Sequence, residues 1–144
     1  MEGNFFDLGH GSGKAIVAAA IIGSFKQITG IELLDGLYYQ SIRQKDKYLK
    51  ETGDSNQDIK LLQGNFLEES CEWWSQSDFV YMNNVFEDNL IAQIGVRASA
   101  MKPGSWFVTL FKPLPADEKW DRRLTKFMTM SWGMALVHVH FKLK

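Results

Sequence analysis

The sequence contains almost no cysteine: among its 144 residues, Cys71 is the only one. A single cysteine excludes a disulfide within the chain and a metal cluster held by several thiolates, so we expect no metal site. Long apolar runs are also missing, because no stretch approaches the ~18 residues that a membrane-spanning helix needs. The apolar run at residues 15–22 is short and lacks the flanks of a signal peptide, so we expect a buried helix there and no membrane partner.

An excess of charge of either sign is missing as well. The chain has 16 Lys and Arg against 17 Asp and Glu, which gives a net charge of -1 and a pI of about 6.3. A domain that binds nucleic acid through its phosphates needs a concentrated basic face, so we expect no strong direct nucleic-acid binding. Apolar residues make up 45% of the chain, which is typical of one ordinary globular domain with a real core.

Short apolar runs alternate with helical segments along most of the chain. Strands are predicted over residues 4–8, 25–33, 59–62, 78–82 and 106–111, and helices over 14–23, 35–51, 67–74 and 87–101. Two further strands, 124–131 and 135–143, are joined through Trp132-Gly133 without a helix, which indicates an antiparallel hairpin. The pattern predicts an α/β, Rossmann-like fold whose seven-stranded sheet is mostly parallel, with helices on both faces.

The loops that follow the first four strands are the expected place for a ligand. In an open sheet of this kind, ligands bind beyond the carboxyl ends of the strands, where the strand order reverses. These loops begin at Leu8, Leu33, Gln63 and Asn83, and we expect them to converge.

The first loop is rich in glycine and follows an acid. Asp7 precedes Gly9, Gly11 and Gly13, and glycine lets the backbone approach a ligand closely. A dinucleotide site needs its third glycine one residue later, where this chain has Lys14. An acid beside the turn suits a nucleoside that carries a positive amino group and a sulfonium better than it suits a pyrophosphate.

The later loops carry polar residues that suit the same kind of ligand. Glu32 ends the second strand 19 residues after Gly13, where a carboxylate typically binds ribose hydroxyls; the alternative is a solvated acid at a strand end. Asn65 and Phe66 would contact an adenine, or else form a plain turn and a core aromatic. Asn83 would orient a substrate amine, or else cap the following helix.

Taken together, these loops resemble the disruptor of telomeric silencing family, the non-SET histone-lysine methyltransferases. The likeness rests on residues 5–14 (FFDLGHGSGK), 30–32 (GIE), 64–67 (GNFL) and 82–86 (MNNVF). It continues through residues 101–104 (MKPG), 112–115 (KPLP) and 131–132 (SW), and covers the chain from about Asn4 to Leu143. The first two motifs are shared by methyltransferases in general, whereas the later ones are much more particular.

The resemblance implies that residues 1–144 form the catalytic core of a class I protein-lysine methyltransferase with S-adenosylmethionine as cofactor. It implies cofactor contacts at Asp7, Gly9, Gly11, Gly13, Glu32, Asn65, Phe66 and Asn83. Asn83 would also lie beside the reacting methyl group, and Trp132 and His138 would line the channel for the target lysine. The expected partner is a histone or nucleosome, and the expected location is the nucleus.

Three departures from the family pattern bear on this interpretation. The family usually has an acid where Asn65 stands, although an amide oxygen still accepts a hydrogen bond from adenine. It also usually has tyrosines near His138. Because the chain begins just before the first strand, we expect it to lack the family's amino-terminal helical lobe. A non-catalytic module with the same fold is therefore the main alternative, and the glycine spacing argues against a nicotinamide-dependent oxidoreductase.

Overall fold

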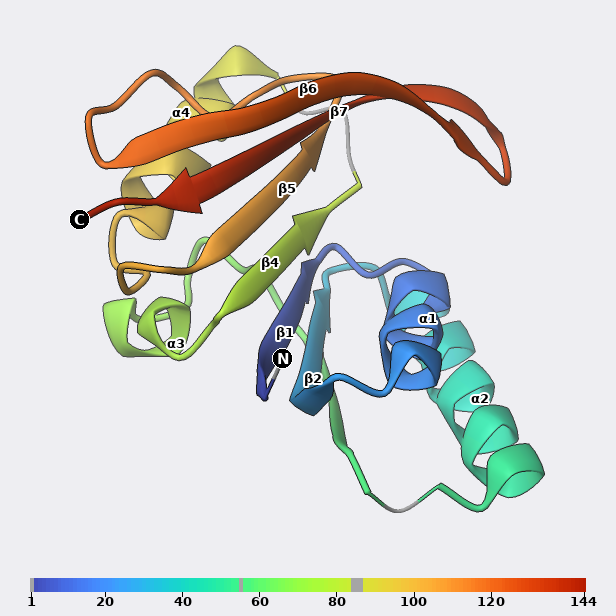
Figure 1. Cartoon of the computed structure of the whole chain (residues 1–144). Coiled ribbons are helices and arrows are strands. Elements are labelled where there is room, and N and C mark those ends of the chain that lie inside the picture. Colours follow the sequence, from blue (N-terminus) through green and yellow to red (C-terminus); the bar gives the residue numbers. More distant parts are fainter. Residues whose placement is uncertain (1, 55, 84–86) are drawn as a thin grey trace. The chain divides into compact units, whose positions relative to one another are not determined.

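The computed structural model describes residues 2–54, 56–83 and 87–144 of the chain (Figure 1). The chain divides into two compact units, residues 1–68 and residues 69–144. Within the described ranges, no helix is both long enough and apolar enough to cross a membrane.

The first unit is a parallel β-α-β-α-β arrangement. It contains β1 (Gly3–Leu8), α1 (Lys14–Ile22), β2 (Phe25–Glu32), α2 (Asp35–Thr52) and β3 (Asp58–Gln63). The strands lie in the order β3-β2-β1, and both neighbouring pairs are parallel. Helix α1 packs against β2 and α2 against β3 (Figure 1). The strands therefore follow the alternation that the sequence predicts.

The core of the first unit comes from residues of β1, β2 and α1. Phe6, Leu8, Ile16, Ile28 and Ile31 are almost completely buried. The second half of β2 is buried at every position, including the polar residues Thr29 and Glu32.

Both helices of the first unit end at a glycine, as the sequence suggests. Gly23 and Gly53 have φ values of 73° and 65°, and each donates its N–H back into the last turn of its helix. An aspartate at the start of the predicted helix 35–51 is a possible cap, but the cap position of α2 belongs to Leu34 and no side chain caps this end. Asp35 is instead the first helical residue, where its negative charge still suits the helix dipole.

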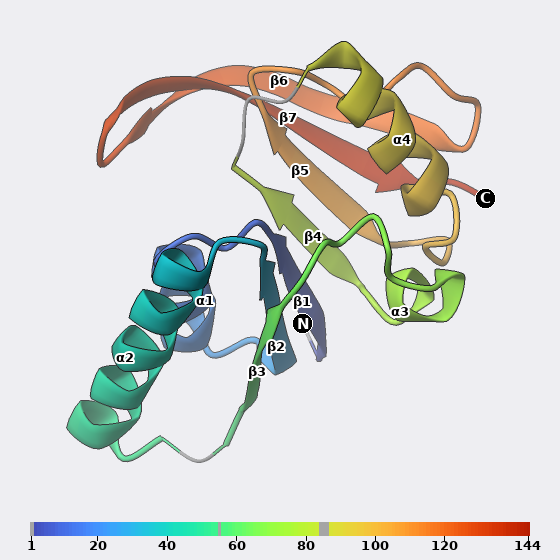
Figure 2. The same cartoon turned by 180° about the vertical axis from the view of Figure 1, so that it is seen from behind.

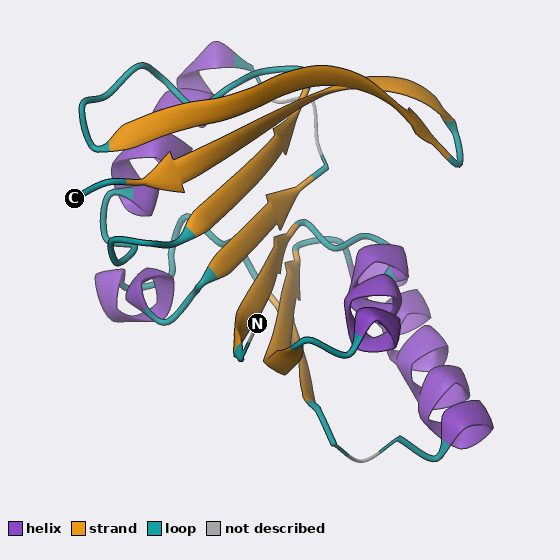
Figure 3. Ribbon diagram, viewed as in Figure 1, coloured by secondary structure: helices purple, strands orange, loops and turns teal. Residues whose placement is uncertain are grey.

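The second unit contains a mixed sheet that ends in a long hairpin (Figure 2). Its elements are α3 (Cys71–Ser75), β4 (Phe79–Met82), α4 (Asp88–Ala98), β5 (Trp106–Leu110), β6 (Trp120–Met130) and β7 (Gly133–Lys142). The strands lie in the order β4-β5-β7-β6 (Figure 3), with β4 parallel to β5 and β7 antiparallel to both neighbours. The predicted antiparallel hairpin is therefore confirmed.

The hairpin differs from its prediction in two ways. Strand β6 begins at Trp120, before the expected start, because pairing with β7 continues through an irregularity between Arg122 and Leu124. In the second half of β7 the buried residues are also the polar ones, since His138, His140 and Lys142 are buried whereas Val139 and Phe141 between them are only half-buried. The Lys142 Nζ atom lies 4.9 Å from the centroid of the Trp120 ring, and burial lowers its pKa.

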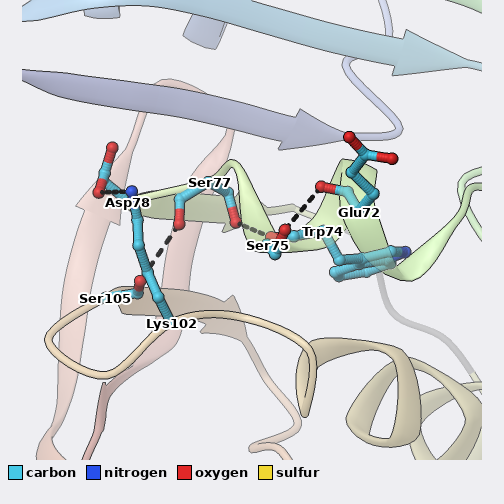
Figure 4. A network of polar contacts seen from close by, with 7 residues as sticks. All are labelled: Glu72, Trp74, Ser75, Ser77, Asp78, Lys102 and Ser105. Carbon is cyan, nitrogen blue, oxygen red and sulfur yellow. Dashed lines mark hydrogen bonds and ion pairs between the residues drawn. The ribbon is translucent and has the colours of Figure 1, made fainter.

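Buried serines fix the start of β4 against the start of β5 (Figure 4). The Ser77 hydroxyl donates to the Trp74 carbonyl at 2.8 Å, and the Ser105 hydroxyl donates to the Ser77 carbonyl at 3.2 Å. Beside them, Lys102 Nζ lies 2.7 Å from Asp78. These contacts lie at the start of the two strands and help to fix the register in which β4 pairs with β5.

The fold predicts that a methyl group is not tolerated at Gly30. A Cβ atom there would lie 2.5 Å from His10 Cδ2 and 2.9 Å from Ile16 Cδ1, and both side chains are buried. Gly30→Ala should therefore lower the free energy of unfolding by about 1–3 kcal/mol in urea denaturation. Gly64→Ala is the matched control, because its Cβ would make only an ordinary contact of 3.6 Å with Ile31. Equal midpoints for the two variants would contradict the prediction.

Candidate functional site

In the first unit, the loops after β1, β2 and β3 meet at one edge of the strands. The backbone N–H groups of Gly9 and His10 donate to the Ile31 carbonyl at 2.8 and 3.2 Å. From the third loop, the Gly64 N–H donates to the Glu32 carbonyl at 3.0 Å. The convergence expected from the strand pattern is present for these three loops.

The Glu32 side chain lies at the centre of this meeting point. One carboxylate oxygen accepts the Gly11 N–H at 2.9 Å, and the other accepts the Leu34 N–H at 2.9 Å. The side chain is only 7% exposed, so its orientation is fixed by these two bonds. Each oxygen retains a further lone pair, which leaves the carboxylate able to accept hydrogen bonds from ligand hydroxyls.

The three loop glycines all have a left-handed backbone conformation, but the space beside Gly11 differs from the space beside Gly13. Gly9, Gly11 and Gly13 have φ values of 72°, 55° and 89°. A Cβ at Gly11 would meet nothing within 4 Å, so open space borders the backbone there. A Cβ at Gly13 would lie 3.1 Å from Ser41 Cβ, so this glycine admits helix α2. The turn is thus open beside Gly11 and closely packed beside Gly13.

His10 lies within the glycine turn but points into the protein. Its Nδ1 donates to the Gly11 carbonyl at 2.9 Å, and the ring packs against the position where Gly30 lacks a side chain. Its Nε2 is buried without a partner in the described part of the chain, and burial lowers the pKa of the ring. The sequence analysis gave His10 no role, and the structure assigns it to packing.

Asp7 is a buried acid next to the same turn. It is 2% exposed, and burial together with the nearby Glu32 charge raises its pKa to about 8. A positive ligand group close to Asp7 would favour its ionised form, whereas a pyrophosphate would oppose it. The two acids of the first unit therefore suit a positively charged nucleoside better than they suit a pyrophosphate.

Asn65 and Phe66 follow β3 at the same edge. The Asn65 side-chain oxygen accepts the Leu67 N–H at 3.0 Å, which closes a local turn. Phe66 is 9% exposed and belongs mainly to the core. Both residues lie close to Glu32 along the chain, because they directly follow Gly64, whose N–H donates to the Glu32 carbonyl.

In the second unit, Asn83 lies at the carboxyl end of β4. Met82 is paired with Thr109 of the parallel strand β5, so Asn83 is level with the end of β5. Asn83 is exposed. The rest of that motif, Asn84, Val85 and Phe86, lies outside the described residues.

Phe111, directly after β5, was not singled out by the sequence analysis. It is the one non-glycine residue with positive φ, 66°, in the described ranges. Its N–H donates to the Leu136 carbonyl at 2.7 Å, and its carbonyl accepts from His138 Nε2 at 3.1 Å. Its ring centroid lies 5.9 Å from that of Trp132, and both side chains are substantially exposed. The Lys112 N–H also donates to the Leu110 carbonyl at 2.8 Å, so Phe111 is the central residue of a local turn that is also bound to strand β7.

His138 is 3% exposed and both of its ring nitrogens have partners. Nε2 must donate, because the Phe111 carbonyl only accepts, so the neutral ring uses Nδ1 to accept from the Thr125 hydroxyl at 3.0 Å. The structure therefore connects His138 to Trp132 through Phe111, and it leaves no free ring nitrogen on His138.

The segment after Phe111 is tied down by a second histidine and an ion pair. His140 Nδ1 donates to the Phe107 carbonyl and its Nε2 accepts the Leu114 N–H, and burial lowers its pKa to about 4. Lys112 Nζ lies 2.8 Å from Asp88 at the start of α4. A cavity of about 620 Å³ adjoins this segment, and none of the predicted site residues lines it.

Solved structures of methyltransferases share the fold of this chain. A Haemophilus influenzae protein described as a methylase matches with a TM-score of 0.72 and 19% identity, over 99% of this chain and 88% of that one. An RNA methyltransferase from Salinibacter ruber, in complex with S-adenosyl-L-homocysteine, gives 0.73 and 17%, over 99% and 82%. The B. subtilis tRNA methyltransferase TrmK gives 0.71 and 14%, over 96% and 59%.

These likenesses confirm the predicted Rossmann-like class I fold, and the chain is an S-adenosylmethionine-dependent methyltransferase. A comparison with curated proteins found no match. The sequence does match the family described as "Histone methylation protein DOT1" over residues 1–142. The chain belongs to this family, which confirms the resemblance drawn from its loop motifs.

The raised pKa of Asp7 predicts an unusual dependence of stability on pH. The folded chain holds a proton at Asp7 up to about pH 8, whereas an unfolded aspartate with a pKa of 3.8 releases it. The free energy of unfolding should therefore fall as the pH rises through this window. Asp7→Asn should remove the effect and stabilise the ligand-free protein at pH 8 by at least about 2 kcal/mol, since one pKa unit corresponds to about 1.36 kcal/mol.

Urea denaturation at pH 5 and pH 8 measures this difference. Asp58→Asn is the control, because Asp58 is exposed on β3 and should not change the pH dependence. A wild-type protein with the same stability at both pH values would disprove the assignment.

Proposed function

We propose that this chain methylates the side-chain amine of lysine in a protein, with a histone as the favoured target. Membership of a family described by histone methylation supports the target class. The observation that supports the proposal is the carboxyl end of β5, where Asn83 follows β4 at the level of Leu110 and the exposed rings of Phe111 and Trp132 lie 5.9 Å apart. A histone target would place the protein in the nucleus.

The hairpin provides an environment that favours a neutral lysine. A lysine with a pKa near 10.4 must lose its proton to attack, which costs about 4 kcal/mol at pH 7. Apolar surroundings and nearby cations both lower a lysine pKa. Asp121 pairs with Phe141 at the end of the hairpin away from Trp132, and residues 122–144 contain no acidic side chain, whereas they contain Arg122, Arg123 and Lys126. A lysine that docks beside Trp132 would therefore meet no acidic side chain from these residues to stabilise its charge.

The first unit would hold the cofactor through the residues that converge at its edge. Glu32 would accept from the ribose hydroxyls, and Asp7 with Gly9, Gly11 and Gly13 would surround the methionine part. Asn65 and Phe66 would lie at the adenine. Bound S-adenosylmethionine supplies a methyl group that is already activated, so the protein has mainly to position the acceptor and exclude water.

At the acceptor side, Asn83 would orient the attacking nitrogen. An amide oxygen accepts an N–H of the amine and so directs the nitrogen lone pair, but it cannot remove a proton. Trp132 would cover the aliphatic part of the lysine. His138 has both ring nitrogens engaged, so the proton would leave the amine to solvent.

Labelled S-adenosylmethionine tests the proposal when it is incubated with nucleosomes, free histone octamers and total RNA. Mass spectrometry should find methyl-lysine in histone. Label in RNA alone would overturn the protein target in favour of an RNA methyltransferase. Tight cofactor binding without transfer to any of these would favour the non-catalytic alternative.

Glu32→Gln should weaken the binding of S-adenosyl-L-homocysteine at least about tenfold in isothermal calorimetry. The amide keeps one acceptor oxygen, but it presents an N–H where the carboxylate accepted from Gly11 or Leu34. Glu51→Gln makes the same chemical change near the other end of α2, at an exposed position, and should leave the affinity unchanged. Equal affinities for both variants would reject the role of Glu32.

Asn83→Ala should slow transfer at least about tenfold while it leaves cofactor affinity within about twofold, because misplaced reacting atoms lower the rate more than binding. Single-turnover transfer to histone octamers and calorimetry separate the two quantities. Asn89→Ala, at an exposed position of α4, is the control. A transfer rate equal to that of the control would rule out a positioning role for Asn83.

A further inference from the structure

Phe111 combines two features that rarely occur together. Its backbone has a φ of 66°, which is unfavourable for a bulky residue, and its ring is 36% exposed rather than buried in the core. Exposure means that core packing does not account for the unfavourable backbone. Strain of this kind tends to occur where a side chain must be presented in a particular direction.

A local turn and two hydrogen bonds to the hairpin hold Phe111 in this conformation, and in the turn the Lys112 N–H donates to the Leu110 carbonyl at 2.8 Å across Phe111. Leu136 accepts its N–H and His138 donates to its carbonyl, so both backbone groups of Phe111 are bound to strand β7. The Thr125 hydroxyl on β6 donates to the other nitrogen of His138, which fixes the tautomer that can donate to Phe111. The conformation is thus maintained by the local turn together with the hairpin.

The result is a pair of aromatic rings at the carboxyl end of β5. The Phe111 and Trp132 centroids lie 5.9 Å apart at an angle of 38°, within the range in which aromatic rings attract. Residues 133–136 of β7 pair with β6 but not with β5, so the hairpin tip that carries Trp132 extends beyond β5 (Figure 2). Phe111 lies against that tip, one residue beyond the level of Asn83.

We propose that Phe111 is a second substrate-contacting residue, which forms with Trp132 an apolar surface for the methylene chain of the target lysine. His138 is a positioning residue that acts through the Phe111 carbonyl. This inference rests on the proposed transfer to lysine and adds a specificity residue to that site. The ring faces can bind the methylenes and a cationic or neutral amine, but they offer no hydrogen bond to a carboxylate or an amide.

Phe111→Gly separates this role from a structural one. Glycine adopts a positive φ without strain, so the variant should keep or raise the Tm of the wild type. It should nevertheless lower kcat/KM for histone octamers at least about tenfold, mainly through KM, with unchanged affinity for S-adenosyl-L-homocysteine. Phe127→Ala is the matched control, because it removes an even more exposed ring from β6 of the same hairpin.

The His138 variants test positioning against proton transfer. His138→Gln keeps a side-chain N–H donor for the Phe111 carbonyl and should retain most of the activity with an unchanged pH profile. His138→Leu should lose activity to the same extent as Phe111→Gly, and the double variant should be no worse than either single one. Loss of activity in His138→Gln, with an altered pH profile, would overturn the positioning role.

The outcomes distinguish the two proposals. A wild-type protein that transfers no methyl group to lysine would refute the proposed function, and this inference with it. Transfer by the wild type, with Phe111→Gly as active as Phe127→Ala, would refute the inference alone. If Phe111→Gly fails to fold, Phe111→Asn replaces it, because asparagine also tolerates a positive φ and has no ring.

Discussion

The hydrogen bond from the Gly11 N–H to the Glu32 carboxylate is the contact on which the cofactor side of this protein depends. A buried carboxylate is costly unless it accepts hydrogen bonds, and bonds to a charged acceptor are the strong ones. The bond also joins the turn after β1 to the end of β2, 21 positions along the chain. The glycine turn and the acid therefore stabilise each other before any ligand binds.

Much of this side could be predicted because its determinants are local. The glycine spacing, the acid before it and Glu32 at the end of a buried strand are each visible in a short window of sequence. The packing of His10 against Gly30 was not predictable in that way, since it depends on which neighbour each residue meets after folding. The cap of α2 was not predictable from the sequence for a similar reason: Asp35 has the right chemistry for a cap but lies one position inside the helix.

The acceptor side was harder to predict because distant residues determine it. Alternation along β7 suggests one polar face, yet His138 and His140 are both buried. His138 bonds to Phe111 after β5, and His140 bonds to Phe107 of β5 and to Leu114 in the segment that follows. A strand pattern shows which residues share a face, but not what covers that face. The backbone of Phe111 depends both on the local bond from the Lys112 N–H to the Leu110 carbonyl and on contacts with β7, and the second set is not visible in its own neighbourhood in the sequence.

The two sides also differ in their electrostatics. Asp7 and Glu32 are buried acids beside the glycine turn, and the first of them has a pKa near 8 in the ligand-free chain. The hairpin contains cations and no acid after Asp121. The buried acids beside the glycine turn favour a cationic cofactor, whereas the cations of the hairpin favour a neutral amine. Methyl transfer moves positive charge from the sulfonium to the amine, so the charged product amine would be disfavoured on the hairpin, and the electrostatics that favour the neutral amine before transfer would also favour release of the product after it.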